Sequence, residues 1–136
     1  MKAYKLLLVM MAIVFWSCES QSEDETDDDS IIGKWKLKTV ELVFVAEKHD
    51  YSKYNIVYEF QSNNILKVSG ATDLNIIELY RGMPYGEYSY SIMINDNGVQ
   101  YIKIGSINTA YGISNKTLVL STAPLDGPIQ TLTKIK

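Results

Sequence analysis

Residues 30–136 predict an all-β fold, a small antiparallel up-and-down β-barrel of eight or nine short strands. Apolar and polar residues alternate in short runs along this part of the chain, which is the period of a strand with one buried face. Clusters of Asn, Asp, Ser and Gly separate the runs, and no long segment has the periodicity of a helix. The chain of 136 residues has room for one such domain.

The first predicted strand, residues 35–45, changes phase along its length. Its apolar positions fall into two parities, Trp35 and Leu37 in one and Val40, Leu42 and Phe44 in the other. Such a change predicts a bulge or a sharp bend, as where a strand turns a barrel corner. A polar stretch, residues 46–53, then leads to the next strand.

The remaining strands are predicted from alternation and from turn signals. They cover residues 54–60, 65–68, 87–94, 99–104, 117–121 and 129–135, with a loop at 123–128. Turns are predicted at residues 62–64, at Asn97-Gly98, which tolerates the positive φ of a tight hairpin, and at residues 114–116. Residues 74–80 fit either a strand or a short helix, and the β-branched Ile76 and Ile77 favour the strand.

Residues 1–17 predict a secretory signal peptide. Lys2 and Lys5 stand at the start without an acid, and residues 6–16 are an unbroken run of eleven apolar residues. A spanning helix needs about 20 apolar residues, so this run is too short to be one. A basic start before a short apolar core is typical of export. The alternative is a buried N-terminal helix.

Ser17-Cys18 directly follows the apolar run and resembles a bacterial lipobox. The resemblance implies that the Cys18 thiol receives diacylglycerol, that the signal peptide is removed before it, and that the new amine is acylated. Several acyl chains, at about 0.8 kcal/mol per buried methylene, hold a domain stably on a membrane. The alternative is an inert free thiol.

Residues 18–29 are predicted to join the lipidated cysteine to the domain by a disordered acidic tether. Residues 19–29 hold seven acids in eleven positions, with no base and no apolar residue. Fully extended they span about 40 Å. They resemble the export signal of surface lipoproteins in Gram-negative bacteria, which implies an outer-membrane protein on the cell surface, with the periplasmic face as the alternative. Calcium binding by residues 27–29 is disfavoured, because the EF-hand spacing and glycine are missing.

The composition excludes several classes of site. The formal charge is −3, but residues 30–136 carry 9 acids and 11 bases without a basic stripe, so we expect no nucleic-acid partner. One cysteine and one histidine exclude a disulfide framework, a thiolate zinc cluster and a multi-histidine metal site. We therefore expect neither a metal nor a cofactor.

The start of the domain resembles the lipocalin-like family. Gly33-Lys34-Trp35 matches the G-x-W opening of that family, Gly86-Glu87-Tyr88 resembles its mid-domain strand start, and residues 117–120 resemble its closing hairpin. The resemblance implies a barrel in which Gly33 and Trp35 are structural and Trp35 packs at the closed base. The family has an arginine that caps this tryptophan, and Lys134 lies near the corresponding place in the sequence.

Tyrosines mark two strands of the predicted barrel. Tyr54, Tyr58, Tyr88 and Tyr90 lie on one face of each of two strands, and they are the candidate ligand-binding residues if that face points inward. An eight-stranded barrel is just wide enough for its own side chains or for one small ligand. These rings therefore either fill the barrel or line a pocket in which their hydroxyls orient a ligand.

Three functions remain open on these observations. The first is a lipid-anchored binding protein for a small hydrophobic or aromatic ligand. The second is a non-catalytic interaction module of the cell envelope that touches a protein or glycan, with residues 82–86 as the expected exposed contact. The third is an enzyme, which we do not expect, because His49 lies in a polar stretch without a partner nucleophile and no catalytic motif occurs.

Overall fold

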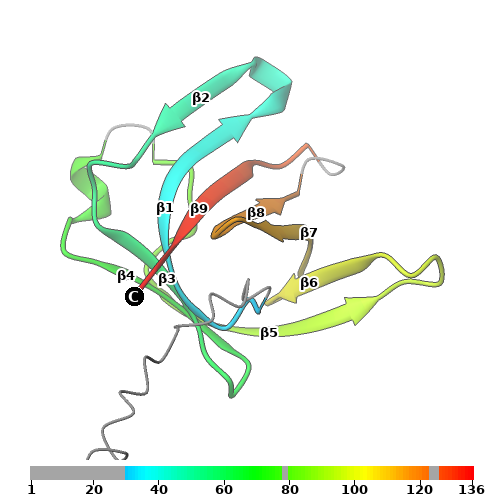
Figure 1. Cartoon of the computed structure of the whole chain (residues 1–136). Coiled ribbons are helices and arrows are strands. Elements are labelled where there is room, and N and C mark those ends of the chain that lie inside the picture. Colours follow the sequence, from blue (N-terminus) through cyan, green and yellow to red (C-terminus); the bar gives the residue numbers. More distant parts are fainter. Residues whose placement is uncertain (1–29, 78–79, 123–125) are drawn as a thin grey trace, which may run out of the picture.

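The computed structural model describes residues 30–77, 80–122 and 126–136, and the fold drawn in Figure 1 is all-β. Its strands are β1 (Gly33–Leu42), β2 (Glu47–Asp50), β3 (Ile56–Phe60), β4 (Ile65–Gly70), β5 (Gly86–Ile94), β6 (Gln100–Ile104), β7 (Ile107–Ser114), β8 (Thr117–Ser121) and β9 (Ile129–Ile135). Each strand pairs antiparallel with its neighbours, in the order β2-β1-β3-β4-β5-β6-β7-β8-β9. An additional β1–β9 pairing closes eight strands into a barrel, and among the described strands β2 pairs with β1 alone. The predicted small up-and-down barrel is confirmed.

The bulge expected in the first strand is confirmed. The register of β1 on β9 shifts between Leu37 and Thr39, so Trp35, Leu37 and Val40 are all buried although the parity changes. The predicted extension to residue 45 is wrong. β1 ends at Leu42, and Val43–Val45 form a short 3-10 helix, η1, closed by Ala46 at a φ of 53°.

Two strands have no counterpart in the sequence-based assignment. β2 forms inside the polar stretch 46–53 and has no buried residue, so no hydrophobic alternation marks it. β7 spans residues 107–114, where Thr109 is the only buried position of the strand. β2 is recruited by hydrogen bonding to β1 rather than by burial of one face, whereas β7 directs Thr109, Tyr111 and Ile113 at alternate positions toward the core.

The prediction of a strand at residues 74–80 is wrong for the residues of this segment that the structure describes. Leu74–Ile76 form a second 3-10 helix, η2, and residues 78 and 79 lie outside the described ranges. Asp73 starts η2, because its carboxylate accepts hydrogen bonds of 2.9 Å from the backbone and the side-chain amide of Asn75. This local capping outweighs the strand preference of Ile76, which is exposed.

The predicted hairpin turns are confirmed. Gly98 has a φ of 78°, and the side chain of Asn95 accepts from the backbone amides of Asn97 and Val99 across the β5–β6 turn. Asn115 and Lys116 both have positive φ, as the two central residues of a type I′ turn require. Of the predicted loop 123–128, residues 123–125 lie outside the described ranges.

The up-and-down order places the connections alternately at two ends of the barrel. The turns at 61–64, 95–99 and 115–116 lie at the end where β1 begins and β9 finishes, which we call the base. The connections 43–55, 71–85, 105–106 and 122–128 lie at the opposite end, which we call the loop end. The candidate site described below is at the loop end.

Trp35 anchors the base. Its side chain is fully buried, and its indole Nε1–H donates a 2.7 Å hydrogen bond to the carbonyl oxygen of Ile31. The Lys134 ammonium lies 5.2 Å from the centre of the indole ring and donates to the carbonyl oxygen of Ser30. Lys134 therefore covers the tryptophan at the point where the chain enters and leaves the barrel.

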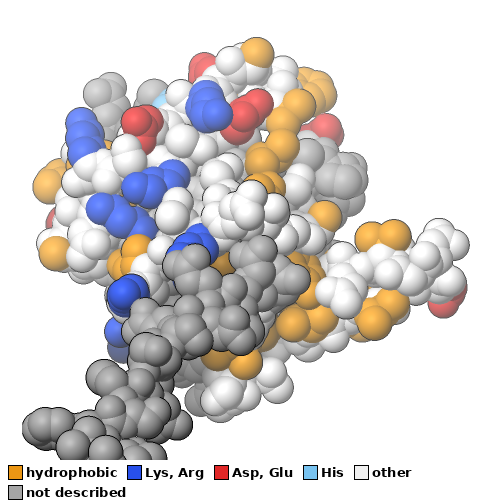
Figure 2. Space-filling model, in the orientation of Figure 1, with side chains coloured by type: hydrophobic (Ala, Val, Ile, Leu, Met, Phe, Trp, Pro, Cys, Tyr) orange, Lys and Arg blue, Asp and Glu red, His pale blue; other side chains and the backbone are white. Residues whose placement is uncertain are grey.

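Apolar side chains also remain on the surface. Ile92, Met93, Ile94 and Val99 are exposed on the β5–β6 ribbon, which projects from the barrel (Figure 1) and carries orange patches in Figure 2. At the loop end the tip of the β1–β2 ribbon exposes Phe44, which is 82% accessible. Within the described ranges no helix has the length and apolar character needed to cross a membrane.

Candidate functional site

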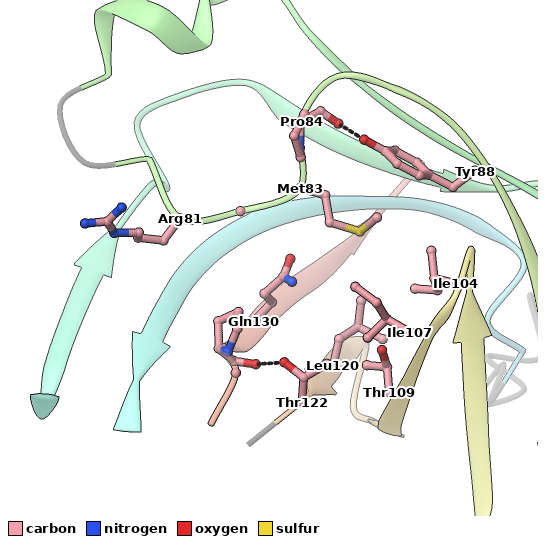
Figure 3. Close-up of a pocket in the computed structure, with 13 residues that line it drawn as sticks. Arg81, Met83, Pro84, Tyr88, Ile104, Ile107, Thr109, Leu120, Thr122 and Gln130 are labelled. Carbon is pink, nitrogen blue, oxygen red and sulfur yellow. Dashed lines mark hydrogen bonds between the residues drawn. The ribbon is translucent and has the colours of Figure 1, made fainter. Parts of the chain in front are cut away.

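A cavity of about 540 Å³ opens at the loop end of the barrel (Figure 3). Its lining residues are Arg81, Gly82, Met83, Pro84, Tyr88, Ile104, Ile107, Thr109, Leu120, Thr122, Gly127, Pro128 and Gln130. The volume is within the range of about 300–1,000 Å³ that is common for small-molecule sites. Most of the lining side chains are apolar, so the cavity suits an apolar ligand.

The cavity follows directly from the strand order. Ile104 ends β6, Ile107 begins β7 and Gln130 is near the start of β9. All three residues therefore lie at the same end of the barrel. Below them the barrel is filled, because Tyr58 and Leu132 are fully buried in its interior. The ligand space is therefore the upper part of a barrel whose lower part is a packed core.

The segment Arg81–Pro84 forms one side of the cavity and is held by tyrosine hydroxyls. The backbone N–H of Met83 donates a 2.8 Å hydrogen bond to the hydroxyl oxygen of Tyr58. The hydroxyl of Tyr80 donates to the carbonyl oxygen of Met83, also at 2.8 Å. Both polar groups of the Met83 backbone are thus bonded to tyrosines that pack in or against the core.

Three further tyrosines secure the same connection. The Tyr88 hydroxyl donates to the carbonyl oxygen of Pro84 at 2.9 Å, as drawn in Figure 3. The Tyr51 hydroxyl accepts from the backbone of Arg81 at 3.2 Å, and the Tyr85 hydroxyl donates to the carbonyl of Thr72 at 2.6 Å. The connection is thus fixed to the barrel at several points, which gives the cavity a preformed wall.

One glycine permits the close packing of this connection. A Cβ added to Gly82 would collide with the hydroxyl and ring of Tyr80. Because the same Tyr80 hydroxyl holds Met83, a side chain at position 82 would displace the tyrosine that fixes the cavity wall.

Two buried polar side chains line the otherwise apolar cavity. Gln130 is 8% exposed and Thr109 is 5% exposed, and they are the buried polar residues among those described. The Tyr58 hydroxyl donates a 2.7 Å hydrogen bond to Oε1 of Gln130. In Figure 3 the Gln130 amide points toward the segment that carries Met83.

The charges near the cavity are few. Arg81 is the single charged residue among the described lining residues, and Figure 3 shows its guanidinium group directed away from the other lining side chains. Burial raises the pKa of Tyr58 well above its usual range and raises the pKa of Tyr80 to about 12. Both hydroxyls are therefore neutral at physiological pH and remain available as hydrogen-bond donors.

The four candidate tyrosines occupy different places. Tyr88 lines the cavity, whereas Tyr58 lies beneath it with its hydroxyl bonded to Gln130 and Met83. Tyr90 packs edge-on against Phe60, and its hydroxyl donates to the carbonyl of Gln61 at the base. Tyr54 is half-buried against the core and does not line the cavity. The structure thus brings together Tyr58 and Tyr88 near one cavity and separates Tyr90 from them.

Other predicted residues are placed as follows. Gly33 and Trp35 begin β1 at the base, away from the cavity, and Cys18 lies outside the described residues. Of residues 82–86, Met83 and Tyr85 pack against the core, so that segment is less exposed than the interaction hypothesis requires. His49 lies on β2, with Nε2 3.4 Å from a carboxylate oxygen of Glu47.

The sequence analysis did not identify Gln130, Thr109 or Met83. A signal for Gln130 was present, because it shares the inward parity of Leu132 in the predicted strand 129–135. A polar residue on the buried face of a strand needs a partner and is a candidate for a functional role. Thr109 carried no such signal, since the strand that contains it was not predicted.

The described residues hold no group of three or more His, Cys, Asp or Glu side chains that could bind a metal ion. Comparison of the chain with protein-family models, curated proteins and solved structures gives no match.

Proposed function

We propose that this protein is a non-catalytic, lipid-anchored lipoprotein whose barrel binds a small hydrophobic ligand at its loop end. The observation that carries the proposal is the apolar cavity of about 540 Å³ beneath the segment Arg81–Pro84. A closed barrel supplies rigid walls, and the tyrosine hydrogen bonds hold the remaining wall in place. A preformed apolar cavity reduces the ordering cost of binding.

The lipocalin-like resemblance belongs to the same proposal. The up-and-down barrel, the buried Trp35 near the start of β1 and the Lys134 ammonium over its ring support it. In a lipocalin-like barrel of this kind, Trp35 and Lys134 stabilise the base, and the ligand binds at the opposite end. Tyr88 would contact the ligand, whereas Tyr58 and Tyr90 would shape the barrel.

The anchor is proposed from the sequence alone. Cleavage before Cys18, acylation of Cys18 and an acidic tether would display the barrel on the outer membrane of a Gram-negative bacterium, with the cell surface as the favoured face. Mass measurement of the mature protein should give a chain that starts at Cys18 and carries fatty acids. Cys18→Ala should remain an unprocessed precursor. A mature chain that starts elsewhere, or that lacks fatty acids, contradicts the anchor.

Surface display has its own test. Protease treatment of intact cells should release the barrel by cleavage within residues 19–29, because an extended acidic tether is open to proteolysis. Complete protection in intact cells, with cleavage after the outer membrane is permeabilised, would place the protein on the periplasmic face.

Ligand binding is tested with the protein purified from its own membrane. Native mass spectrometry should detect a retained small molecule on the wild-type protein. Ile107→Trp should abolish retention, because Ile107 lines the cavity and is half exposed, so a larger side chain occupies the opening with little strain on the core. Ile92→Trp is the matched control, since Ile92 has similar exposure on the β5–β6 ribbon. Absence of a retained molecule from all three proteins would contradict binding.

A second candidate is a non-catalytic interaction module of the cell envelope. The exposed apolar side chains Ile92, Met93, Ile94 and Val99 on the projecting β5–β6 ribbon favour it over the segment 82–86. An Ile92→Ser, Ile94→Ser double variant should lose an envelope partner that co-purifies with the wild type while its fold is unchanged. The same partner on both proteins would exclude the ribbon as the contact.

A further inference from the structure

We propose that the cavity selects an aliphatic acyl compound whose carbonyl or carboxylate oxygen accepts a hydrogen bond from Nε2 of Gln130. This inference rests on the proposed function and names the class of ligand that the cavity takes. It follows from the donors and acceptors that surround the Tyr58 hydroxyl, from the burial of Gln130, and from the largely apolar character of the surrounding wall.

The hydrogen bonds around Tyr58 show which end of the Gln130 amide faces the tyrosine and which end faces the cavity. The backbone nitrogen of Met83 is a donor only, so the Tyr58 oxygen accepts from it at 2.8 Å. The hydroxyl of Tyr58 donates to Oε1 of Gln130 at 2.7 Å. The NH₂ group of Gln130 is therefore the side of the amide that remains.

That NH₂ group has no hydrogen-bond partner among the described residues. Gln130 forms no other side-chain hydrogen bond there, and its nitrogen is not one of the completely enclosed polar atoms. It therefore faces the open space of the cavity, which Gln130 lines. A donor on a side chain that is more than nine-tenths buried needs an acceptor, and a ligand oxygen would supply one.

The rest of the wall limits the ligand further. Met83, Ile104, Ile107 and Leu120 are flexible or branched aliphatic side chains, which suit an aliphatic body better than a stacked aromatic ring. No carboxylate is among the described lining residues that could pair with a cation, whereas Nε2 of Gln130 offers a donor to an oxygen acceptor. The cavity therefore favours a neutral or anionic head group and disfavours an ammonium group.

Thr109 offers a second polar contact on the same wall. Its side chain is buried, lines the cavity and makes no hydrogen bond to another described residue. A hydroxyl both donates and accepts, so Thr109 fits an acid, an ester or a bound water beside either. It does not distinguish among these, and Gln130 is the residue that sets the requirement for an acceptor.

The test compares three probes with the same apolar tail: decanoate, monodecanoylglycerol and decylammonium. Each is titrated by native mass spectrometry against the mature lipoprotein at one detergent concentration. We expect the wild type to bind decanoate or monodecanoylglycerol at least about tenfold more tightly than decylammonium. The oxygen of either of the first two probes accepts a hydrogen bond from Gln130, whereas the ammonium group is itself a donor and leaves the Gln130 donor unpaired. Tighter binding of decanoate indicates a free acid, and tighter binding of the ester indicates an acylated lipid. Equal affinity for all three probes overturns the inference.

Gln130→Glu tests the residue itself. The glutamate keeps an oxygen for the Tyr58 hydroxyl but replaces the donor by an acceptor of negative charge. We expect decanoate binding to weaken by about tenfold or more and decylammonium binding to strengthen. Gln100→Glu is the matched control, because Oε1 of Gln100 also accepts from a tyrosine hydroxyl, that of Tyr111 at 2.8 Å, on the exposed surface.

The two proposals fail in different ways. If Gln130→Glu and Gln100→Glu bind decanoate equally while Ile107→Trp does not bind it, the cavity binds ligands but Gln130 does not select them, and the inference is wrong. If Ile107→Trp binds decanoate as the wild type does, the probe lies elsewhere and the proposed function fails with it. The probe preference of the wild type decides the inference even if Gln130→Glu does not fold, which circular dichroism would reveal.

Discussion

Tyr58 and Gln130, 72 positions apart in the chain, are joined across the barrel by a 2.7 Å hydrogen bond between the tyrosine hydroxyl and the glutamine Oε1. The same hydroxyl accepts from the backbone of Met83, so one buried oxygen connects β3, β9 and the segment that forms the cavity wall. Tyr58 is fully buried, and its ring is also part of the barrel core. The pair therefore links the packed interior to the candidate site.

Removal of that hydroxyl should destabilise the protein. Tyr58→Phe leaves the ring in place but leaves two buried polar groups, Met83 N–H and Gln130 Oε1, without their partner. We expect a loss of about 1–3 kcal/mol in the free energy of unfolding, the cost of leaving buried polar groups unsatisfied. Urea denaturation measures it. Tyr111→Phe is the control, because its hydroxyl bonds to Gln100 on the exposed surface, and it should cost less. Equal losses would show that the Tyr58 hydroxyl has no special structural role.

Alkaline pH should weaken the same region. Burial raises the pKa of Tyr80 to about 12 and that of Tyr58 well above its ordinary value of 10.0. A group whose pKa is higher in the folded state stabilises the fold fully below its unfolded pKa and loses that contribution as the pH rises through the folded pKa. We therefore expect stability to be constant below pH 10 on this account and to fall between about pH 10 and 12.

The measurement is a series of urea denaturations across that interval. Tyr80→Phe should be less stable near neutral pH but should show a shallower fall, because one of the buried titrating groups is absent. Ionisation can be followed separately by the ultraviolet absorbance of tyrosinate. Identical slopes for the two proteins would contradict a raised pKa at Tyr80.

The strands with alternating, strongly apolar buried residues were predictable, and those without such a pattern were not. Ile56, Tyr58 and Phe60 are buried at every second position of β3, and their alternation is visible in the sequence. β2 lies outside the closed barrel and has no buried residue, so its pairing with β1 left no hydrophobic pattern. Strand formation there depends on backbone hydrogen bonds to the preceding strand β1, and such bonds leave no pattern in the side chains.

The candidate site was less predictable than the fold. The parity of Tyr58 and Tyr88 placed both inside, but parity does not indicate how far along the barrel axis the packed core ends and the cavity begins. The position along the axis where the core ends depends on the connection 71–85, where tyrosine hydroxyls form hydrogen bonds to backbone groups of Met83 and Pro84. The contact between Tyr58 and Met83 joins residues that are 25 positions apart, and the two local contacts lie in a segment without strand or helix periodicity, so composition or spacing does not specify them.

Lys134 should contribute to stability through its position over Trp35. Its ammonium lies 5.2 Å from the ring centre and also donates to Ser30, so Lys134→Met removes the charge while it keeps an apolar stem of similar length. We expect a loss of about 0.5–1 kcal/mol, the usual size of a cation–π contact near the surface. Chemical denaturation followed by tryptophan fluorescence measures it. Lys103→Met, on an exposed position of β6, is the control and should be neutral.

Glycine at position 70 should be required by the connection that carries the cavity wall. A Cβ added to Gly70 would collide with the Tyr85 hydroxyl and would lie 2.5 Å from the carbonyl oxygen of Asn55. The Asn55 contact is to backbone, so it is not relieved by a side-chain rotation, and movement of Tyr85 would break its hydrogen bond to Thr72. We therefore expect Gly70→Ala to destabilise the protein by about 1–3 kcal/mol, as overpacking does.

Gly112→Ala provides the matched comparison. Gly112 is also a strand glycine, but a Cβ there meets nothing within 4 Å, and its φ is not in the left-handed region. The alanine should stabilise the protein by about 0.4–1 kcal/mol, because it restricts the unfolded chain without strain in the folded one. Urea denaturation of both variants should thus give shifts of opposite sign. If Gly70→Ala leaves the midpoint unchanged or raises it as Gly112→Ala does, the close packing of Tyr85 on Gly70 does not constrain the connection.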